Sequence, residues 1–114
     1  MHELSITESI LEISLRHARK ANASRITNLY LVVGQLASIV DDSVQFYWDI
    51  ISSGTIADGA ELHFRRLPAM LLCLDCQHQY TLSGDGFACP ECSSEHVKVV
   101  SGEEFFMEAI DVEP

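Results

Sequence analysis

Four cysteines in two Cys-x-x-Cys pairs constrain this chain more than any other feature. The first pair is Cys73 and Cys76, the second is Cys89 and Cys92, and twelve residues separate the pairs. Two such pairs can bring four thiolates to one tetrahedral ion, for which Zn(II), with a Zn–S distance of about 2.3 Å, is the natural occupant. The spacing therefore predicts a zinc ribbon over residues 69–100, in which a metal replaces a core that about thirty residues cannot build.

Other chemistry at these cysteines is less favoured. A closed four-cysteine site leaves no open coordination position for hydrolysis, and the chain contains no HExxH motif. A redox dithiol is an alternative for one Cys-x-x-Cys pair, but two pairs at ribbon spacing favour a metal. His78 and His96 follow the two pairs closely, and we interpret them as solvated loop histidines rather than as further ligands.

The charge balance excludes several classes of partner. The chain has 17 acidic and 7 basic residues, and Lys98 is the single basic residue of positions 67–114. A net charge of −10 argues against nucleic acid and against anionic membrane surfaces, because both attract Lys and Arg. No stretch resembles a secretory leader or a membrane span. We therefore expect a cytoplasmic protein without a membrane or nucleic-acid partner, with reduced thiols available for a metal.

Two segments outside the cysteine module have helical periodicity. A capping box of Ser5 and Glu8 predicts that the first helix begins just after residues 1–3, and Asn22 or Ser24 can terminate it. Asp41 or Asp42 can supply the N-cap of the second helix. The predicted buried faces are Ile10, Leu11, Leu15 and Ala18 in the first helix, and Val44, Tyr47, Trp48 and Ile51 in the second.

Three segments have strand patterns, at residues 25–33, 60–67 and 104–112. The first is apolar on nearly both faces, which predicts a central strand. The last has too few neighbours for a domain of its own, so we expect it to return and pair with the earlier strands. The predicted fold is α+β: a small three-stranded sheet with two helices and an inserted zinc ribbon. The expected domains are residues 1–68 plus 101–114, and residues 69–100.

The amino terminus carries a second possible metal site. The α-amine of Met1, the backbone nitrogen and imidazole of His2, and a donor from Glu3 can surround one ion. Four N/O donors in a plane suit Ni(II) or Cu(II). Considered alone, a histidine near a chain terminus is more often incidental than a ligand, and Glu3 could also serve as a first-turn charge of the helix.

The opening Met-His-Glu-Leu-Ser, a helix that follows at once, and a late Cys-x-x-Cys…Cys-Pro-x-Cys ribbon together resemble the HypA/HybF family of nickel-incorporation proteins. The resemblance covers essentially the whole chain. It implies a non-enzymatic protein that binds Ni(II) near Met1, His2 and Glu3. It also implies Zn(II) at Cys73, Cys76, Cys89 and Cys92.

The resemblance also implies partners. A family member hands nickel to the [NiFe] hydrogenase large-subunit precursor and works with a HypB-type nickel GTPase. An acidic residue near position 40, here Asp41 or Asp42, is a weaker match to an auxiliary nickel ligand. The sequence is compatible with a monomer or a homodimer. A zinc-ribbon module that binds proteins or nucleic acid without delivering nickel is the alternative, but it leaves Met1-His2-Glu3 unexplained.

Overall fold

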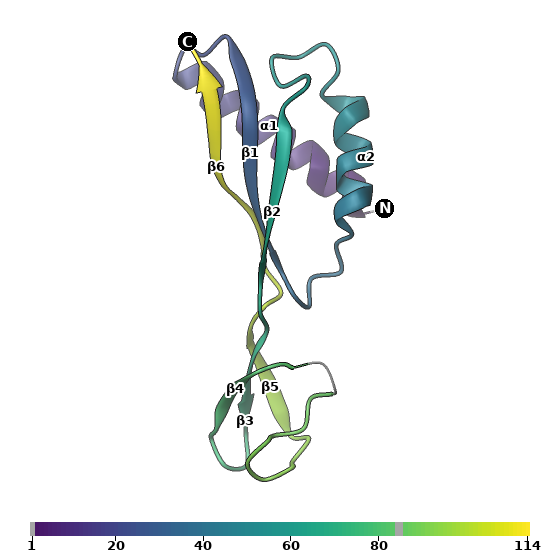
Figure 1. Ribbon diagram of the computed structural model, residues 1–114, viewed down its shortest axis with the longest axis vertical. Helices are drawn as coiled ribbons and strands as arrows, with labels where there is room; N and C mark the ends of the chain where they lie inside the picture. The colour runs from purple at the N-terminus through teal and green to yellow at the C-terminus, as the bar shows by residue number, and fades with distance from the viewer. Residues whose placement is uncertain (1, 84–85) are drawn as a thin grey trace. The chain divides into compact units, whose positions relative to one another are not determined.

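The computed structural model describes residues 2–83 and 86–114, without the side chain of His2. These residues form two helices and six strands (Figure 1). In chain order they are α1 (His2–Lys20), β1 (Arg25–Gly34), α2 (Asp41–Ile51), β2 (Glu61–Leu67), β3 (Met70–Cys73), β4 (Gln79–Thr81), β5 (Val97–Ser101) and β6 (Phe105–Glu113).

Chain contacts divide the molecule into two compact units. Unit 1 comprises Met1–Val32, Ser38–Arg65 and Phe106–Pro114, and unit 2 comprises Val33–Ala37 and Arg66–Phe105. This division differs from the domains expected from the sequence chiefly at residues 33–37, 66–68 and 101–105. The expected domain boundaries themselves stay a prediction.

Unit 1 contains the α+β arrangement predicted from the sequence. Its strands follow the order β2-β1-β6, so β1 is central and the last strand returns to pair with it. Helices α1 and α2 pack against each other, and α1 runs across one face of the sheet (Figure 1). The core consists mainly of aliphatic residues of β1 and one face of α2, namely Ile26, Leu29, Leu31, Val32, Val44 and Trp48.

Helix α1 begins earlier than the sequence predicts. The capping box places its start at Ser5, whereas the helix begins at His2 and Ser5 lies exposed within it. Residues 2 and 3 are therefore part of the first turn rather than a lead-in. Leu4 is half-buried and extends the apolar stripe back by one turn, which favours helix over a cap at this point.

The other end of α1 confirms the predicted terminator. Asn22 has a positive φ of 54°, and the N–H of Ala23 donates to the carbonyl of Ala18 at 2.9 Å. The N–H of Asn22 donates to Arg19. These two bonds form a Schellman motif, in which asparagine adopts the left-handed conformation that closes the helix.

Neither Asp41 nor Asp42 caps α2, so this prediction is wrong. The N-cap is Val40, in an extended conformation and without a side-chain capping bond. The two aspartates instead occupy the first helical turn, where a carboxylate interacts favourably with the helix dipole without bonding as a cap. Val44 and Trp48 are buried and Tyr47 and Ile51 half-buried, as predicted.

Unit 2 contains a second three-stranded sheet, in the order β4-β3-β5. Strand β3 is central and antiparallel to both neighbours: Leu71 pairs with Tyr80 on one side and Val99 on the other. β3 ends at Cys73, so the sheet leads directly into the first cysteine pair. The sequence predicted a ribbon here without resolving its strands.

Three backbone segments meet at the base of this ribbon. A Cβ atom added at Gly34 would lie 2.1 Å from the carbonyl oxygen of Gly102, and one added at Gly102 would lie 2.5 Å from the Cα of Ala69. Gly102 has a φ of 112°. The N–H of Leu36 donates to Gly102, and Gln35 accepts from the N–H of Ala69 through its side chain. Residues 33–37 are therefore hydrogen-bonded into unit 2.

No helix among the described residues is long and apolar enough to cross a membrane.

Candidate metal centre

The four cysteines converge at the end of the ribbon. Their Sγ atoms all lie within 4.8 Å of one another, and they form the one group of three or more potential metal-ligating side chains among residues 2–83 and 86–114. Cys73 and Cys89 are buried, whereas Cys76 and Cys92 are exposed. The Sγ atoms of Cys73 and Cys92 lie 3.6 Å apart, as do those of Cys76 and Cys89.

Both cysteine pairs are built in the same way. In the first, the N–H of Gln77 donates to the carbonyl of Cys73, and the N–H of Cys73 donates to His78. In the second, the N–H of Ser93 donates to the carbonyl of Cys89, and the N–H of Cys89 donates to the carbonyl of Ser94. The residue after each pair has a positive φ, 66° at Gln77 and 63° at Ser93. Sequence reasoning missed these two left-handed residues, although their common position directly after Cys-x-x-Cys is a usable signal.

Backbone N–H groups point at the buried sulfurs. Cys76 donates to the Sγ of Cys73 at 3.5 Å, and Glu91 donates to that of Cys89 at 3.4 Å. Donors of this kind stabilise thiolate, the form that binds metal. The N–H of Cys76 is the main cause that lowers the pKa of Cys73 to about 7.

The sulfurs of Cys76 and Cys92 resist ionisation. The backbone at His78 favours the thiolate of Cys76, but partial loss of water around the sulfur and the neighbouring sulfurs outweigh it and raise the pKa of Cys76 to about 12. The pKa of Cys92 is raised as well: the Ser94 backbone lowers it, but the hydrogen bond with Cys73 and partial loss of water around the sulfur prevail. Four close thiols cannot all lose their protons unless a cation balances the charge.

This donor set fits one zinc ion. Four sulfurs placed tetrahedrally about 2.3 Å from a metal would be separated by about 3.8 Å. The two Sγ–Sγ separations of 3.6 Å, Cys73 to Cys92 and Cys76 to Cys89, are close to that value. The chemistry also agrees, because soft thiolates in tetrahedral array select zinc over hard cations.

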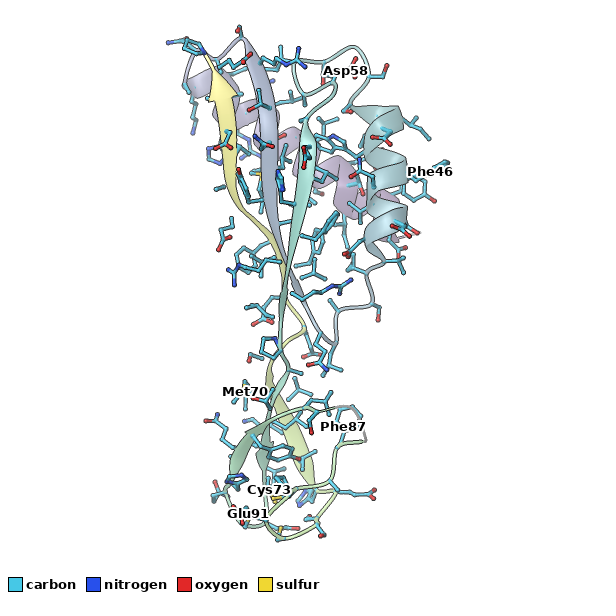
Figure 2. All side chains as sticks on the ribbon, viewed as in Figure 1. Phe46, Asp58, Met70, Cys73, Phe87 and Glu91 are labelled. Atoms are coloured by element: carbon cyan, nitrogen blue, oxygen red, sulfur yellow. The ribbon has the colours of Figure 1, made fainter. Side chains whose placement is uncertain are left out.

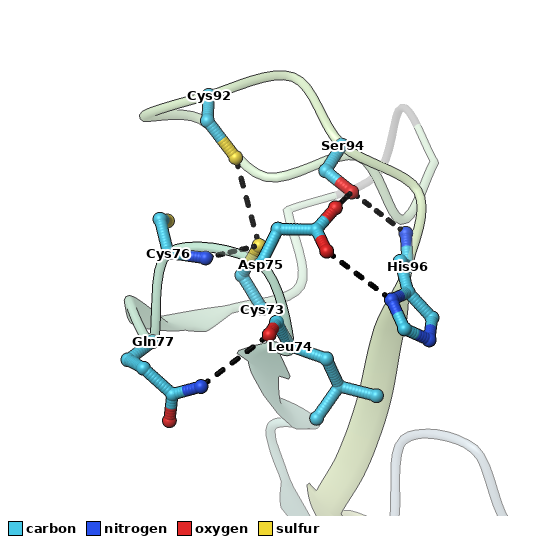
Figure 3. Close-up of polar contacts among 8 residues, drawn as sticks. All are labelled: Cys73, Leu74, Asp75, Cys76, Gln77, Cys92, Ser94 and His96. Carbon is cyan, nitrogen blue, oxygen red and sulfur yellow. Dashed lines mark hydrogen bonds and ion pairs between the residues drawn. The ribbon is translucent and has the colours of Figure 1, made fainter.

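A polar bracket joins the two cysteine pairs beside the sulfurs (Figure 3). Ser94 donates through its hydroxyl to Asp75 at 2.5 Å, the ring of His96 lies 3.3 Å from the same carboxylate, and the N–H of His96 donates to Ser94 at 3.0 Å. Ser94 and then His96 lower the pKa of Asp75. His96 therefore contacts the bracket rather than the sulfur cluster, and His78 stacks on Tyr80.

The predicted amino-terminal donors are only partly described. Met1 and the side chain of His2 lie outside the described residues. Glu3 is half-buried in the first turn of α1, and its carbonyl accepts from Thr7 at 2.5 Å. Asp41 and Asp42 lie in the first turn of α2. The nickel site predicted at residues 1–3 stays a prediction.

Comparison with known proteins identifies the family. The family described as "Hydrogenase/urease nickel incorporation, metallochaperone, hypA" matches residues 1–112. The chain belongs to the HypA family. The family is described as one of metallochaperones, and HypA proteins are maturation factors rather than enzymes.

Curated HypA relatives match almost end to end. The hydrogenase maturation factor HypA of Dehalococcoides mccartyi is 42% identical over 113 residues, which cover 99% of this chain and 95% of the relative. HypA of Caldanaerobacter subterraneus is 37% identical, with 99% of this chain and all of the relative covered. HybF of Shigella boydii is 34% identical over 113 residues, with 99% of this chain and all of the relative covered.

Solved HypA structures share the fold. The solution structure of the Ni metallochaperone HypA from Helicobacter pylori superimposes with a TM-score of 0.69 at 20% identity and covers 97% of both chains. A second HypA solution structure gives a TM-score of 0.73 at 21% identity, covering 98% of this chain and 96% of the other. At these identities the likeness supports the fold alone.

Proposed function

We propose that this chain is a nickel metallochaperone for [NiFe] hydrogenase maturation, binding Ni(II) through Met1, His2 and Glu3. The match of residues 1–112 to a nickel-incorporation family carries this proposal. The full-length likeness to a hydrogenase maturation factor supports it. We further propose delivery to the hydrogenase large-subunit precursor with a HypB-type GTPase, in the cytoplasm.

The start of α1 at His2 suits this nickel site chemically. The N–H groups of the first helical turn have no carbonyl four residues earlier in the helix, so metal binding at the backbone nitrogens of residues 2 and 3 would break no i to i−4 bond of α1. Together with the α-amine of Met1 and the imidazole of His2, they offer nitrogen donors within a few bonds of one another. Nitrogen donors in a plane suit Ni(II). The Glu3 carboxylate can replace one of them.

Zinc at the four cysteines has a structural role in this proposal. Four thiolates close its coordination shell, which leaves no position for substrate or water. Nickel, in contrast, is cargo. Donors at a chain terminus can be displaced one at a time by those of a recipient, so transfer requires ligand exchange and no covalent chemistry.

Nickel titration of the tag-free, zinc-loaded protein tests the proposal, because a tag would block the α-amine. We expect one Ni(II) bound with micromolar or tighter affinity. His2→Ala should abolish this binding and leave the zinc content at one equivalent. Glu3→Gln should weaken it less, since a backbone nitrogen can take the place of the carboxylate.

His17→Ala is the matched control, because His17 lies exposed near the other end of the same helix. It should bind nickel as the wild type does. If His2→Ala binds nickel like the wild type, the amino-terminal site is wrong. If His17→Ala loses nickel as fully as His2→Ala does, the loss is not specific to residues 1–3 and the proposed site is likewise wrong.

A further inference from the structure

The outer side of α2 is unusually apolar for a solvent-facing helix surface. Phe46 and Ile50 are 61% and 58% exposed, the highest values among the exposed large hydrophobic side chains of the described residues. They are four positions apart and so lie on one helix face. Figure 2 shows Phe46 projecting from α2 away from the sheet. Contact with water does not stabilise large apolar side chains, and when several are exposed together they often mark an interaction surface.

A groove beside the helices carries further apolar side chains. It has a volume of about 310 Å³ and is lined by Leu11 and Leu15 of α1, by Ile51 of α2, and by Glu8, Glu12 and Arg19 at its margin. Ile51 adjoins Ile50 in the sequence, so the groove and the exposed stripe share α2. We call Leu11, Leu15, Phe46, Ile50 and Ile51 the helical face.

Acidic side chains border the helical face. Glu8 and Glu12 flank it on α1, and Asp42 and Asp49 lie on the exposed side of α2. No lysine or arginine occurs between Arg25 and Arg65, a span that includes all of α2. Arg16 pairs loosely with Glu12 at 3.9 Å, and the remaining basic residues of α1 lie in its last turn.

We infer that the helical face is a docking site for a partner protein that presents apolar side chains bordered by lysine or arginine. Apolar contact would supply affinity through Phe46 and Ile50, while the surrounding carboxylates would select a basic partner and speed its approach. An anionic lipid surface does not fit, because the carboxylates would repel it.

A second copy of the chain fits less well than a basic partner. A two-fold contact places the same surface of each copy against the other. It would therefore bring Asp42 and Asp49 of one copy close to those of the next, and like charges facing each other are unfavourable. The inference concerns the helices alone and does not depend on nickel binding at residues 1–3.

The test uses a designed helical peptide with leucines on one side and lysines on the other, titrated into the full-length, zinc-loaded protein. We expect backbone amide NMR shifts to change mainly in α1 and α2. Phe46→Ser with Ile50→Ser should weaken binding about tenfold or more, the effect of losing buried anchor residues. Glu12→Gln with Asp49→Asn should weaken binding and reduce its dependence on salt.

Two controls make the result decisive. Phe106→Ser removes a similarly exposed aromatic side chain, 45% exposed, from β6 of the same unit, and should leave binding unchanged. A peptide with glutamates in place of the lysines should not bind. The near-ultraviolet circular dichroism of Trp48, the single tryptophan, verifies that each variant is folded.

Three outcomes would overturn the inference. The first is a shift pattern concentrated on the acidic residues of unit 2, which would indicate general charge attraction. The second is equal weakening by Phe106→Ser and by the double variant. The third is concentration-dependent shifts of the helical face in the protein alone, because a second copy would then be the occupant.

Discussion

Unit 1 buries large apolar side chains from α1, β1, α2 and β2, whereas unit 2 buries few. Apart from Val33, the buried apolar residues of unit 2 are Ala69, Leu71 and the cysteines Cys73 and Cys89. Two of these four are candidate metal ligands. The contrast teaches that one short chain can stabilise two units by different means, apolar burial in one and metal coordination in the other.

Loss of the metal should have the largest effect and should be confined to unit 2. A structural zinc ion contributes on the order of 10 kcal/mol to folding. Zinc chelation, or Cys73→Ser, should therefore unfold β3, β4 and β5, as measured by amide hydrogen exchange. Trp48, in unit 1, should keep its near-ultraviolet circular dichroism. Simultaneous loss of both signals would show that the units fold as one.

The reciprocal change removes the largest buried side chain of unit 1. Trp48 is 1% exposed, so Trp48→Ala should lower the free energy of unfolding of unit 1 by about 3–5 kcal/mol through the cavity that it leaves. Zinc content and exchange protection of β3 should not change. Phe46→Ala on the same helix is the control and should cost less than about 0.5 kcal/mol. Zinc loss in Trp48→Ala would contradict the claim that the two units are stabilised by separate means.

Backbone packing at the ribbon base should have a smaller effect. In Gly102→Ala the new methyl group would lie 2.5 Å from the Cα of Ala69, in addition to the strain of a φ of 112°. The strain alone costs about 1–3 kcal/mol. Gly86→Ala is matched, because Gly86 has a φ of 119° and nothing lies within 4 Å of its added Cβ. Denaturant unfolding of unit 2 should give a lower free energy of unfolding for Gly102→Ala than for Gly86→Ala. Equal free energies would show that the close contact between Gly102 and Ala69 does not contribute to stability.

The smallest effect is expected at a polar contact across the sheet of unit 1. The hydroxyl of Tyr30 donates to Asp111 at 2.7 Å, and this bond is the main cause that raises the pKa of Tyr30 above its ordinary value of 10.0. A raised folded-state pKa stabilises the fold below the unfolded pKa, and this stabilisation is lost as pH rises through the folded pKa. Tyr30→Phe should thus be slightly less stable than wild type at neutral pH.

The difference between Tyr30→Phe and the wild type should shrink as the pH is raised above about 10, where tyrosine ionises. Thermal unfolding of both proteins across that range measures it. A stability difference that stays constant with pH would mean that the hydroxyl does not donate to Asp111.

Local sequence signals predicted the elements well and their exact ends less well. The helical periodicity of Val44 and Trp48 and the end of α1 at Asn22 were predicted because each depends on near neighbours in the chain. The start of α1 was wrong because the Ser5–Glu8 pattern competes with Leu4, whose burial depends on the fold.

The rest depends on contacts between distant residues. Nothing near Gly34 in the sequence indicates that it lies against Gly102, and residues 33–37 could not be assigned to unit 2 without that contact. At the candidate site the four cysteines were predicted from their spacing, whereas the bracket of Asp75, Ser94 and His96 was not. Its members are ordinary polar loop residues until the ribbon brings them together.

The interrupted layout of the units has a consequence for synthesis on the ribosome. The sheet of unit 1 is complete only when β6 pairs with β1, and β6 lies after all of unit 2 in the chain. The four cysteines therefore leave the ribosome exit tunnel before the last strand of unit 1 does. The ribbon can acquire its metal while the unit that carries residues 1–3 still lacks one edge of its sheet.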